Sequence, residues 1–565
     1  MLVLRLPTKV TMALHKYDWI LGLITISFCI SAFSNGANDV ANSYATSVAA
    51  RTLTMPQVGV LAAITEFVGA VALGSRVTKT IKSGIIDIKR FNGRPGVLML
   101  AMACAETGSA FWLALATRLG FPVSTTQTII GALVGVGFAS QASISWGWKK
   151  GSVSQTAASW GIAPAIAAGF SAIIFATLKF GILERQNSMA WAMRLIPLYL
   201  SMTCAILALF IVVQTPTSPS LEDFGAGKAV GIILGVLFGC LLISYVFFVP
   251  YFHRRLVQGD KRIRAHHVIL GPLLLRDDPP LFWTNTQASG TIAEDDSAMT
   301  HTVSESETIH GQDFKRADGD LENNATVVAP KPLDKKKISP EERFLAPNRH
   351  LSKFHPRRLT GYLLYGLLHG VTVDCVDFSK DQLADIHSKA RTYDAKVEHL
   401  WTYPQMLSAI IMSIAHGSND VSNAIGPWAA AYDAWKVMAV RSDSDTPIWM
   451  LVVAGLLLGI GFWFFGYHII RQLGNKLTKM SPTRGFSIEL GAAITVLLAS
   501  RLSLPVSTTQ CLTGAAMGVA LMNLDAGALN WKAMAWIFGG WVFTLPCAGL
   551  IAGLLMLMSL NTPHF

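Results

Sequence analysis

The feature that most constrains the fold of this chain is a pair of polar motifs, each of which occurs twice. Asn35–Asn42 reads NGANDVAN and His416–Asn423 reads HGSNDVSN. Pro122–Gln127 and Pro505–Gln510 both read PVSTTQ. Around this second motif, 15 of the 27 residues from Glu106 to Ala132 are identical in the later copy. Two unrelated helices would not agree at this level, so the chain contains an internal duplication.

Both copies are embedded in apolar sequence. Hydrophobic residues make up 52% of the chain and charged residues only 14%, whereas a soluble protein is nearer a quarter charged. Because a membrane crossing needs about 20 apolar residues, this composition predicts a polytopic membrane protein. It excludes a soluble enzyme, a secreted disulfide scaffold and a disordered regulator. We expect twelve crossings, at about 18–50 (broken), 56–74, 98–119, 121–139, 153–179, 192–213, 228–251, 403–430, 447–469, 486–502, 504–522 and 531–559.

The positions of the two copies predict their relative orientation. The first copy covers the first five crossings and the second covers the last five, so seven crossings separate their starts. Because seven is odd, the copies run through the membrane in opposite directions. Inverted repeats are typical of secondary transporters, which hold their substrate near the midplane between the repeats. The predicted fold class is therefore an all-α polytopic membrane protein of about 12 transmembrane helices, with two inverted repeats and broken or re-entrant helices.

The crossings divide the chain into four predicted parts. These are a first repeat unit at 1–180, two intervening helices at 181–251, a large loop at 252–400 and a second repeat unit at 401–565. Within the loop, 277–347 is rich in acidic residues, Ser, Thr, Pro and Lys, and this composition predicts disorder. Basic residues follow the seventh crossing directly, so the positive-inside rule places the loop in the cytoplasm and both termini outside. These basic residues are Arg254, Arg255, Lys261, Arg262 and Arg264. The glycosylation sequon at Asn324 is then expected to stay unmodified.

The first motif carries an acid into the membrane in each copy. A buried carboxylate is costly there unless a cation accompanies it. The neighbouring Gly36 would allow the helix to break and free backbone carbonyls. Carboxylate, amide and carbonyl oxygens suit a hard monovalent cation, so we predict two sodium half-sites; the alternative is a polar helix-packing motif. The half-site residues are Asn38, Asp39 and Asn42 in the first copy, and Asn419, Asp420 and Asn423 in the second.

The second motif predicts an anion site. Proline favours the first turn of a helix, so Pro122 and Pro505 are expected to begin half-helices within the membrane. The first backbone N–H groups of a helix are unpaired and attract anions, and the following hydroxyls add donors. Facing starts of this kind would surround a tetrahedral oxyanion; the alternative is ordinary helix capping. The predicted phosphate-binding residues are Ser124, Thr125, Thr126, Ser507, Thr508 and Thr509.

Three further acids lie in apolar sequence. Glu66, Glu106 and Glu489 are each expected to bind a cation, move a proton or pair with a buried base such as Lys79 or Arg118. The repeat position favours a role for Glu489, while Glu106 is equally well read as a helix-terminal carboxylate. His416, which replaces Asn35 of the first copy, is either a pH-sensitive group or, more commonly, a lone satisfied histidine.

Signatures of enzymes and of ATP hydrolysis are missing from the sequence, so transport would run on an ion gradient. The motifs above, together with GFSIEL at 485–490, resemble the inorganic phosphate transporter (PiT) family, and most closely its fungal sodium/phosphate symporters, the phosphate-repressible permeases. This resemblance covers about 1–255 and 400–565. It implies plasma-membrane uptake of phosphate with sodium, and essential roles for Glu66 and Glu489 as coupling or gating acids. Many members carry His where this chain has Gln127 and Gln510.

We therefore predict a secondary active symporter that imports inorganic phosphate with sodium by alternating access. The alternatives are a proton-coupled phosphate permease, a permease for sulfate or another oxyanion, and a membrane nutrient sensor. No cofactor is expected, since sodium would be a co-transported substrate. The predicted partners are phosphate, sodium and the lipid bilayer, with a homodimer left open. The net charge of +11 belongs to the membrane part and does not indicate nucleic-acid binding.

Overall fold

The computed structural model describes residues 16–149, 151–214, 225–282, 339–376, 381–442, 444–474 and 476–562. The chain divides into two compact units, one formed by 1–280 with 366–565 and the other by 281–365. Regular structure in the described ranges is helical, apart from one isolated β-bridge between Ile86 and Ile144. The sequon at Asn324 and most of the segment predicted to be disordered lie outside the described residues.

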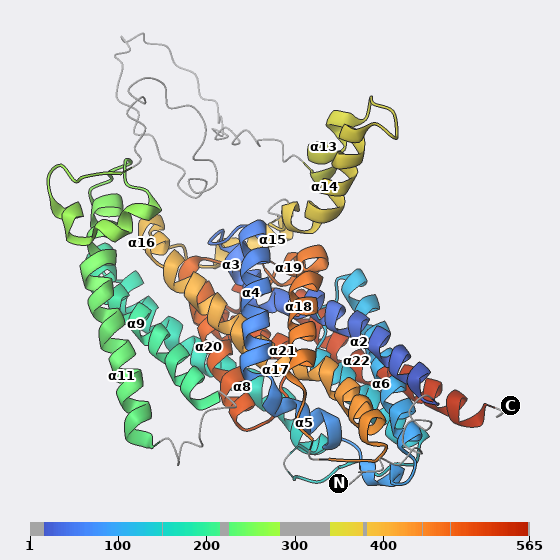
Figure 1. Cartoon of the computed structure of the whole chain (residues 1–565). Coiled ribbons are helices and arrows are strands. Elements are labelled where there is room, and N and C mark those ends of the chain that lie inside the picture. The colour runs from blue at the N-terminus through green and yellow to red at the C-terminus, as the bar shows by residue number, and fades with distance from the viewer. Residues whose placement is uncertain are drawn as a thin grey trace, which may run out of the picture. The chain divides into compact units, whose positions relative to one another are not determined.

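The helices follow the duplication (Figure 1). The first copy contains α2 (Asp18–Asn38), α3 (Val40–Ala49), α4 (Met55–Leu73), α5 (Ser75–Ser83), α6 (Pro95–Leu119), α7 (Thr125–Ala139) and α8 (Val153–Leu178). Between the copies lie α9 (Ser188–Gln214), α11 (Ala226–Ile243), α12 (Val249–Phe252), α13 (Pro340–Phe344), α14 (Pro356–Thr372), α15 (Asp381–Lys389) and α16 (Ala395–Leu400). The second copy contains α17 (Thr402–Val437), α18 (Ile448–Phe465), α19 (Tyr467–Leu473), α20 (Pro482–Arg501), α21 (Thr508–Leu521) and α22 (Trp531–Asn561).

Eight helical segments in the described part of the chain are long and apolar enough to cross a membrane. The other four predicted crossings correspond to α7, α17, α20 and α21. Helices α17 and α20 are long but carry buried polar residues, while α7 and α21 have only 15 and 14 residues. At 1.5 Å per residue each spans about 22 Å, which is less than the roughly 30 Å of a hydrocarbon core. The expected half-helices are thus present in both copies.

Each copy packs its short helix against the last helix of the other copy, in a pseudo-twofold arrangement. Helix α7 packs on α22 of the other copy, and its equivalent α21 packs on α8. Glycines allow both contacts, because a Cβ at Gly135 would overlap the carbonyl of Gly549 and one at Gly518 would overlap that of Ala168. Helices α4 and α18 contact each other. The two copies are therefore interlocked rather than separate bundles, which brings their motifs to one place.

The helix break predicted in the first motif occurs at a single residue. Asp39 separates α2 from α3, whereas α17 runs unbroken through the second motif. Gly36 lies within α2, and a Cβ there would overlap the carbonyl of Leu458 on α18. Gly417 makes the matching close approach to Glu66 on α4. The expected break is therefore present within the motif, three residues after Gly36, and both glycines allow close helix packing.

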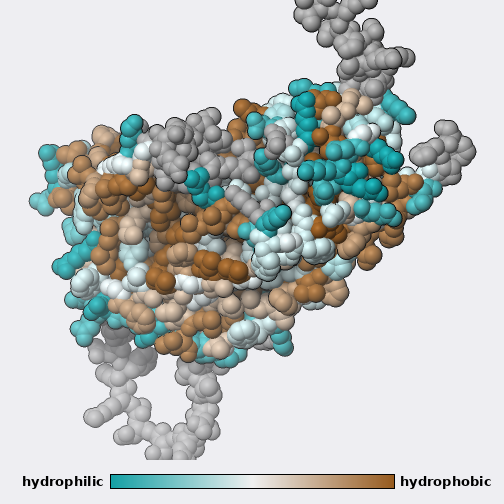
Figure 2. Space-filling model, turned by 90° about the horizontal axis from the view of Figure 1, so that it is seen from below, coloured by the Kyte–Doolittle hydropathy of each residue, from teal (hydrophilic) through white to brown (hydrophobic). Residues whose placement is uncertain are grey.

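The outer surface of the larger unit is apolar. Large hydrophobic side chains are exposed along α8, α11 and α22, and brown, hydrophobic residues cover much of the face shown in Figure 2. Such surface is incompatible with water over this extent but suits lipid. The buried polar residues instead gather inside the unit, on α2, α3, α7, α17, α20 and α21.

Candidate transport site

The two PVSTTQ motifs form helix starts in the interior of the larger unit. Ser124 and Ser507 are the N-cap residues of α7 and α21. Their hydroxyl oxygens accept hydrogen bonds from the backbone N–H groups of Gln127 at 3.1 Å and Gln510 at 3.2 Å. The helices begin at Thr125 and Thr508, three residues after the prolines. The following threonines therefore lie on the first turn, with their hydroxyls directed towards the interior.

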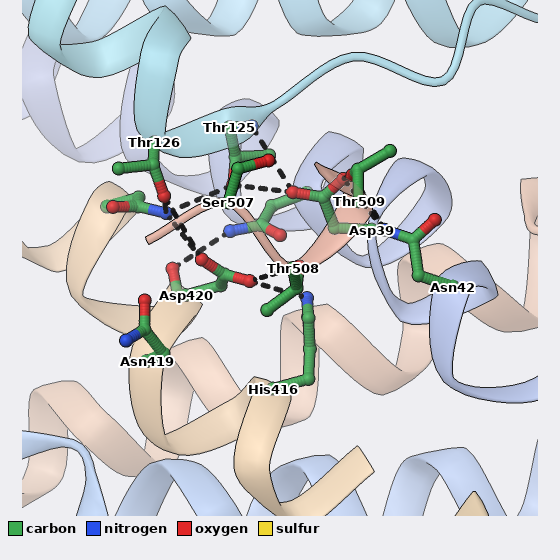
Figure 3. Close-up of polar contacts among 12 residues, drawn as sticks. Asp39, Asn42, Thr125, Thr126, His416, Asn419, Asp420, Ser507, Thr508 and Thr509 are labelled. Atoms are coloured by element: carbon green, nitrogen blue, oxygen red, sulfur yellow. Dashed lines mark hydrogen bonds and ion pairs between the residues drawn. The ribbon is translucent and has the colours of Figure 1, made fainter. Parts of the chain in front are cut away.

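Each motif aspartate accepts hydrogen bonds from threonines of both copies (Figure 3). Asp39 accepts from the Thr125 hydroxyl at 2.6 Å and from the Thr509 hydroxyl at 2.8 Å. Asp420 accepts from the Thr508 hydroxyl at 2.7 Å and from Thr126 at 3.3 Å. All six side chains are buried. The residues predicted for two separate functions, cation and anion binding, are thus brought together in one cluster, which we call the Asp/Thr cluster.

Asn42 and Asn423 join this cluster with their amides. The Asn42 Nδ2 group donates to the Thr509 hydroxyl at 2.7 Å, and that of Asn423 donates to the Thr126 hydroxyl at 3.0 Å. The side-chain carbonyl oxygens of both asparagines have no hydrogen-bond partner among the described residues. A buried polar oxygen without a partner is costly. These oxygens, beside two carboxylates, are the kind of ligand that a hard cation takes.

Asn38 and Asn419 lie beside the cluster and hold helices together. The Asn38 Nδ2 group donates to the Thr117 hydroxyl and to the Phe121 carbonyl, both at 3.0 Å, while its Oδ1 accepts from the Val123 N–H. Asn419 donates in the matching way to the Ser500 hydroxyl at 3.0 Å. Both asparagines therefore position the helix starts. The Oδ1 of Asn38 is already engaged, whereas that of Asn419 has no partner within the described ranges.

His416 lies between two acids. Its Nδ1 is 2.7 Å from Oε2 of Glu66, and its Nε2 is 3.2 Å from Oδ2 of Asp420. Ser413 also donates to Glu66, at 2.6 Å. The acid on α4 therefore lies directly opposite the histidine and satisfies its Nδ1. His416 is thus a buried partner of Glu66.

The donor atoms of Asp39, His416 and Asp420 all lie within 4.8 Å of one another. An imidazole at this distance from two carboxylates can partly balance their charge if it is protonated. A bound cation would do the same, and the oxygen-rich surroundings fit a hard ion better than a metal that prefers sulfur or nitrogen ligands. The sequence expectation of oxygen ligands is consistent with these contacts but is not tested by them.

Glu489 occupies a second polar centre. Its carboxylate accepts from the hydroxyls of Thr46 at 2.5 Å, Ser47 at 2.6 Å and Ser408 at 2.6 Å. The side-chain N–H of Gln405 adds a longer contact at 3.4 Å. These donors come from α3 and α17, so the acid on α20 connects both copies. Glu106, at the matching position of the first copy, is fully buried away from any such set of donors.

Sequence reasoning missed several of these residues. Ser408, Ser413, Thr46 and Ser47 were not singled out, nor was the pairing of His416 with Glu66. A signal was present in α17, where polar residues recur every three to five positions in otherwise apolar sequence and so lie towards one side of the helix. These residues are Gln405, Ser408, Ser413, His416, Asp420 and Asn423.

Comparisons with known proteins agree with this architecture. The model of the phosphate transporter family matches residues 35–552. A phosphate-repressible phosphate permease, pho-4 of Neurospora crassa, is 36% identical over 98% of this chain and 99% of its own length. Sodium-dependent phosphate transporter 1 of Rattus norvegicus is 26% identical over 96% of this chain and 95% of its own. A solved structure described as the sodium-dependent phosphate transporter superposes with a TM-score of 0.64 at 23% identity, covering 96% of this chain and 100% of its own, which supports the fold.

Proposed function

The chain belongs to the phosphate transporter family, and from this premise we propose that it is a symporter that imports inorganic phosphate with sodium ions by alternating access. The observation that carries the proposal is the Asp/Thr cluster. Two buried carboxylates share hydroxyl donors that come from two facing helix starts. The hydroxyls suit phosphate, and the carboxylates beside them suit the cations that would accompany it.

The first step of the argument concerns charge. Phosphate is an anion, and Asp39 and Asp420 would repel it inside a low-dielectric protein. Cations bound to the two carboxylates would remove this repulsion and would attract the anion. Two equivalent acids favour two cations for each phosphate. Coupling then follows from electrostatics, because the anion binds well only where the cations are already present.

The second step concerns hydrogen bonds. Without ions, the hydroxyls of Thr125 and Thr508 donate to the aspartates. Because a bound sodium ion needs the carboxylate and hydroxyl lone pairs, the hydroxyl protons could then turn towards a phosphate oxygen. The N–H groups at the starts of α7 and α21 would add their dipoles. The same atoms thus serve the aspartates in one state and phosphate in the other.

The choice of sodium rests on the ligands. The free side-chain oxygens of Asn42 and Asn423 next to the carboxylates are hard oxygen donors, which a proton would not require. The sequence assignment of Asn38, Asn419, Ser124 and Ser507 to the same sites is retained as part of the proposal. Glu66 and Glu489 would act as coupling acids, since each connects helices of opposite copies.

The proposed placement in the cell follows from the basic residues after α11. We place the protein in the plasma membrane, with the 252–400 loop in the cytoplasm and the termini outside, following the positive-inside rule. The division into units at 1–180, 181–251, 252–400 and 401–565 belongs to this proposal, and a homodimer is left open.

Transport in reconstituted vesicles tests the function. Purified protein in proteoliposomes should accumulate labelled phosphate when sodium is outside, and choline in its place should reduce uptake to background. An inside-negative potential should increase uptake, since two sodium ions with a monovalent phosphate carry one net charge, worth about 2.3 kcal/mol per 100 mV. Equal uptake in choline would refute sodium coupling, and a steep rise on acidification would indicate protons. Competition by excess sulfate would point to a broader oxyanion permease.

A further inference from the structure

Glu106 is a buried acid that the proposed transport cycle does not use. It lies on α6 with no exposed surface, and neither of its carboxylate oxygens has a hydrogen-bond partner among the described residues. Ser31 on α2 faces it. A charged carboxylate in this setting would be uncompensated, which is severely unfavourable within a membrane. The side chain must therefore be neutralised by a ligand.

Comparison with the second copy shows which hydrogen-bond donors are missing around Glu106. Glu489, its equivalent, is held by hydroxyls of Thr46, Ser47 and Ser408. When the two copies are aligned on their first motif, Pro427 corresponds to Thr46 and Trp428 corresponds to Ser47. Neither residue offers a hydroxyl, and the indole N–H of Trp428 donates instead to Thr25.

The remaining candidate donor is also engaged elsewhere. Ser27 corresponds to Ser408, but its hydroxyl lies 2.8 Å from that of Thr107. Ile24 stands where the second copy has Gln405. The first copy has therefore kept the acid of this centre without the set of donors that holds Glu489, so the two equivalent carboxyls occupy chemically different sites.

Helix packing excludes water from Glu106. Two residues further along α6, a Cβ on Gly108 would lie 2.7 Å from the Cβ of Ala552, so α22 covers this part of α6 closely. The elements packed against α6 are α2, α7, α17, α19, α22 and the 3-10 turn Ile88–Phe91. None of the ionisable residues on these elements is a hydrogen-bond partner of Glu106. These residues are Asp18, Cys29, Asp39, Lys89, Arg90, Tyr403, His416, Asp420, Tyr432, Asp433, Lys436, Tyr467, His468, Arg471, Lys532 and Cys547.

We infer that Glu106 is a proton-binding site, separate from the Asp/Thr cluster, at which the bound proton stabilises this conformation of the first copy. A hard cation takes several oxygen ligands, such as those of the Asp/Thr cluster, whereas Ser31 is the one hydroxyl in the described part of the chain that is shown to face Glu106. A proton needs only the carboxyl itself. The inference does not depend on sodium coupling, since it concerns the folded protein in the absence of any gradient.

Infrared difference spectroscopy of the full-length protein in lipid vesicles tests this site. The C=O stretch of a protonated carboxyl should be present in the wild type at neutral pH, should shift in heavy water and should be missing in Glu106→Gln. The matched control, Glu489→Gln, should keep the Glu106 band. A wild-type spectrum without such a band, or a band unchanged in Glu106→Gln, would overturn the proposal. Loss of the band on adding sodium would also overturn it, by assigning the carboxyl to a cation.

Thermal unfolding provides an independent readout. If the folded state holds a proton that the unfolded chain releases, wild-type stability falls as pH rises. The melting temperature of Glu106→Gln should depend less steeply on pH from about pH 5, where the unfolded glutamate has released its proton, up to the pH at which the folded protein releases it. If Glu106→Gln fails to fold, Glu106→Met replaces the carboxyl with an apolar side chain and should show the same flattened profile. Parallel profiles for wild type and variant would count against the proton site.

Discussion

The Nδ1 atom of His416 lies 2.7 Å from Oε2 of Glu66, and both side chains are fully buried. This pair connects α17 of the second copy to α4 of the first. The matching place in the first copy has neither the acid nor the histidine. Gly36 approaches Leu458 there as Gly417 approaches Glu66, and Asn35 stands in place of His416. The Glu66–His416 pair is therefore present at only one of the two positions that the pseudo-twofold axis relates. This makes the two halves chemically unequal.

This inequality predicts a compensation between two substitutions. Glu66→Leu or His416→Asn alone leaves a buried partner unpaired, which typically costs about 3–5 kcal/mol. The double variant recreates the Leu458 and Asn35 arrangement of the first copy and should be closer to wild type in melting temperature than either single variant. Additive losses in the double variant would show that the two residues do not act as a pair.

The Asp/Thr cluster predicts loss of transport without loss of folding. Asp39→Asn and Asp420→Asn each remove one charge that would balance a cation, while the amide keeps the size of the side chain. Sodium-dependent phosphate uptake in vesicles should fall to background in both variants, with a melting temperature within a few degrees of wild type. Asp87→Asn, which alters a partly exposed turn residue outside the cluster, is the matched control and should transport normally. Substantial uptake in both cluster variants would remove these acids from the proposed cation sites.

The shared hydroxyls predict matched effects across the repeats. Thr125→Ala and Thr508→Ala each remove the shorter hydroxyl contact to an aspartate. In the proposed loaded state these hydroxyls donate to phosphate instead, and hydrogen bonds to charged groups contribute about 1.5–3 kcal/mol. The apparent affinity for phosphate should therefore weaken roughly tenfold or more. Thr128→Val provides a control, because that hydroxyl bonds only to the backbone of Ser124 among the contacts described. A strong effect in one repeat and none in the other would contradict equivalent use of the two helix starts.

A pH effect is expected in the loop after α11. Hydrogen bonds from Arg262 hold the pKa of Asp260 at about 2, below its usual value, and Arg254 adds an ion pair at 3.1 Å. Because the folded-state pKa is lowered, this contribution to stability is present above about pH 4. It is lost as the pH falls towards 2. Asp260→Asn should therefore lower the melting temperature at pH 7, and the difference from wild type should shrink at pH 3. A constant difference would show that the ionised carboxylate is not responsible.

Much of the architecture could be predicted from local sequence. Long apolar segments and the repeated motifs were enough to predict the twelve helices, their inverted arrangement and the short helices after Pro122 and Pro505, since hydrophobicity and helix capping act within a few residues. They also singled out Asp39 and Asp420 as paired acids. The family relationship to phosphate transporters followed from the same motifs.

The partners of these residues depended on how the copies interlock. Thr509 donates to Asp39 although 470 positions separate them, and Ser47 donates to Glu489 across 442 positions. A helical pattern determines which face a side chain occupies, but not which distant helix that face meets. The packing of α7 on α22 and of α21 on α8 brings the helix starts together. Only that packing decided that the hydroxyls and carboxylates form one cluster and that Glu66 pairs with His416.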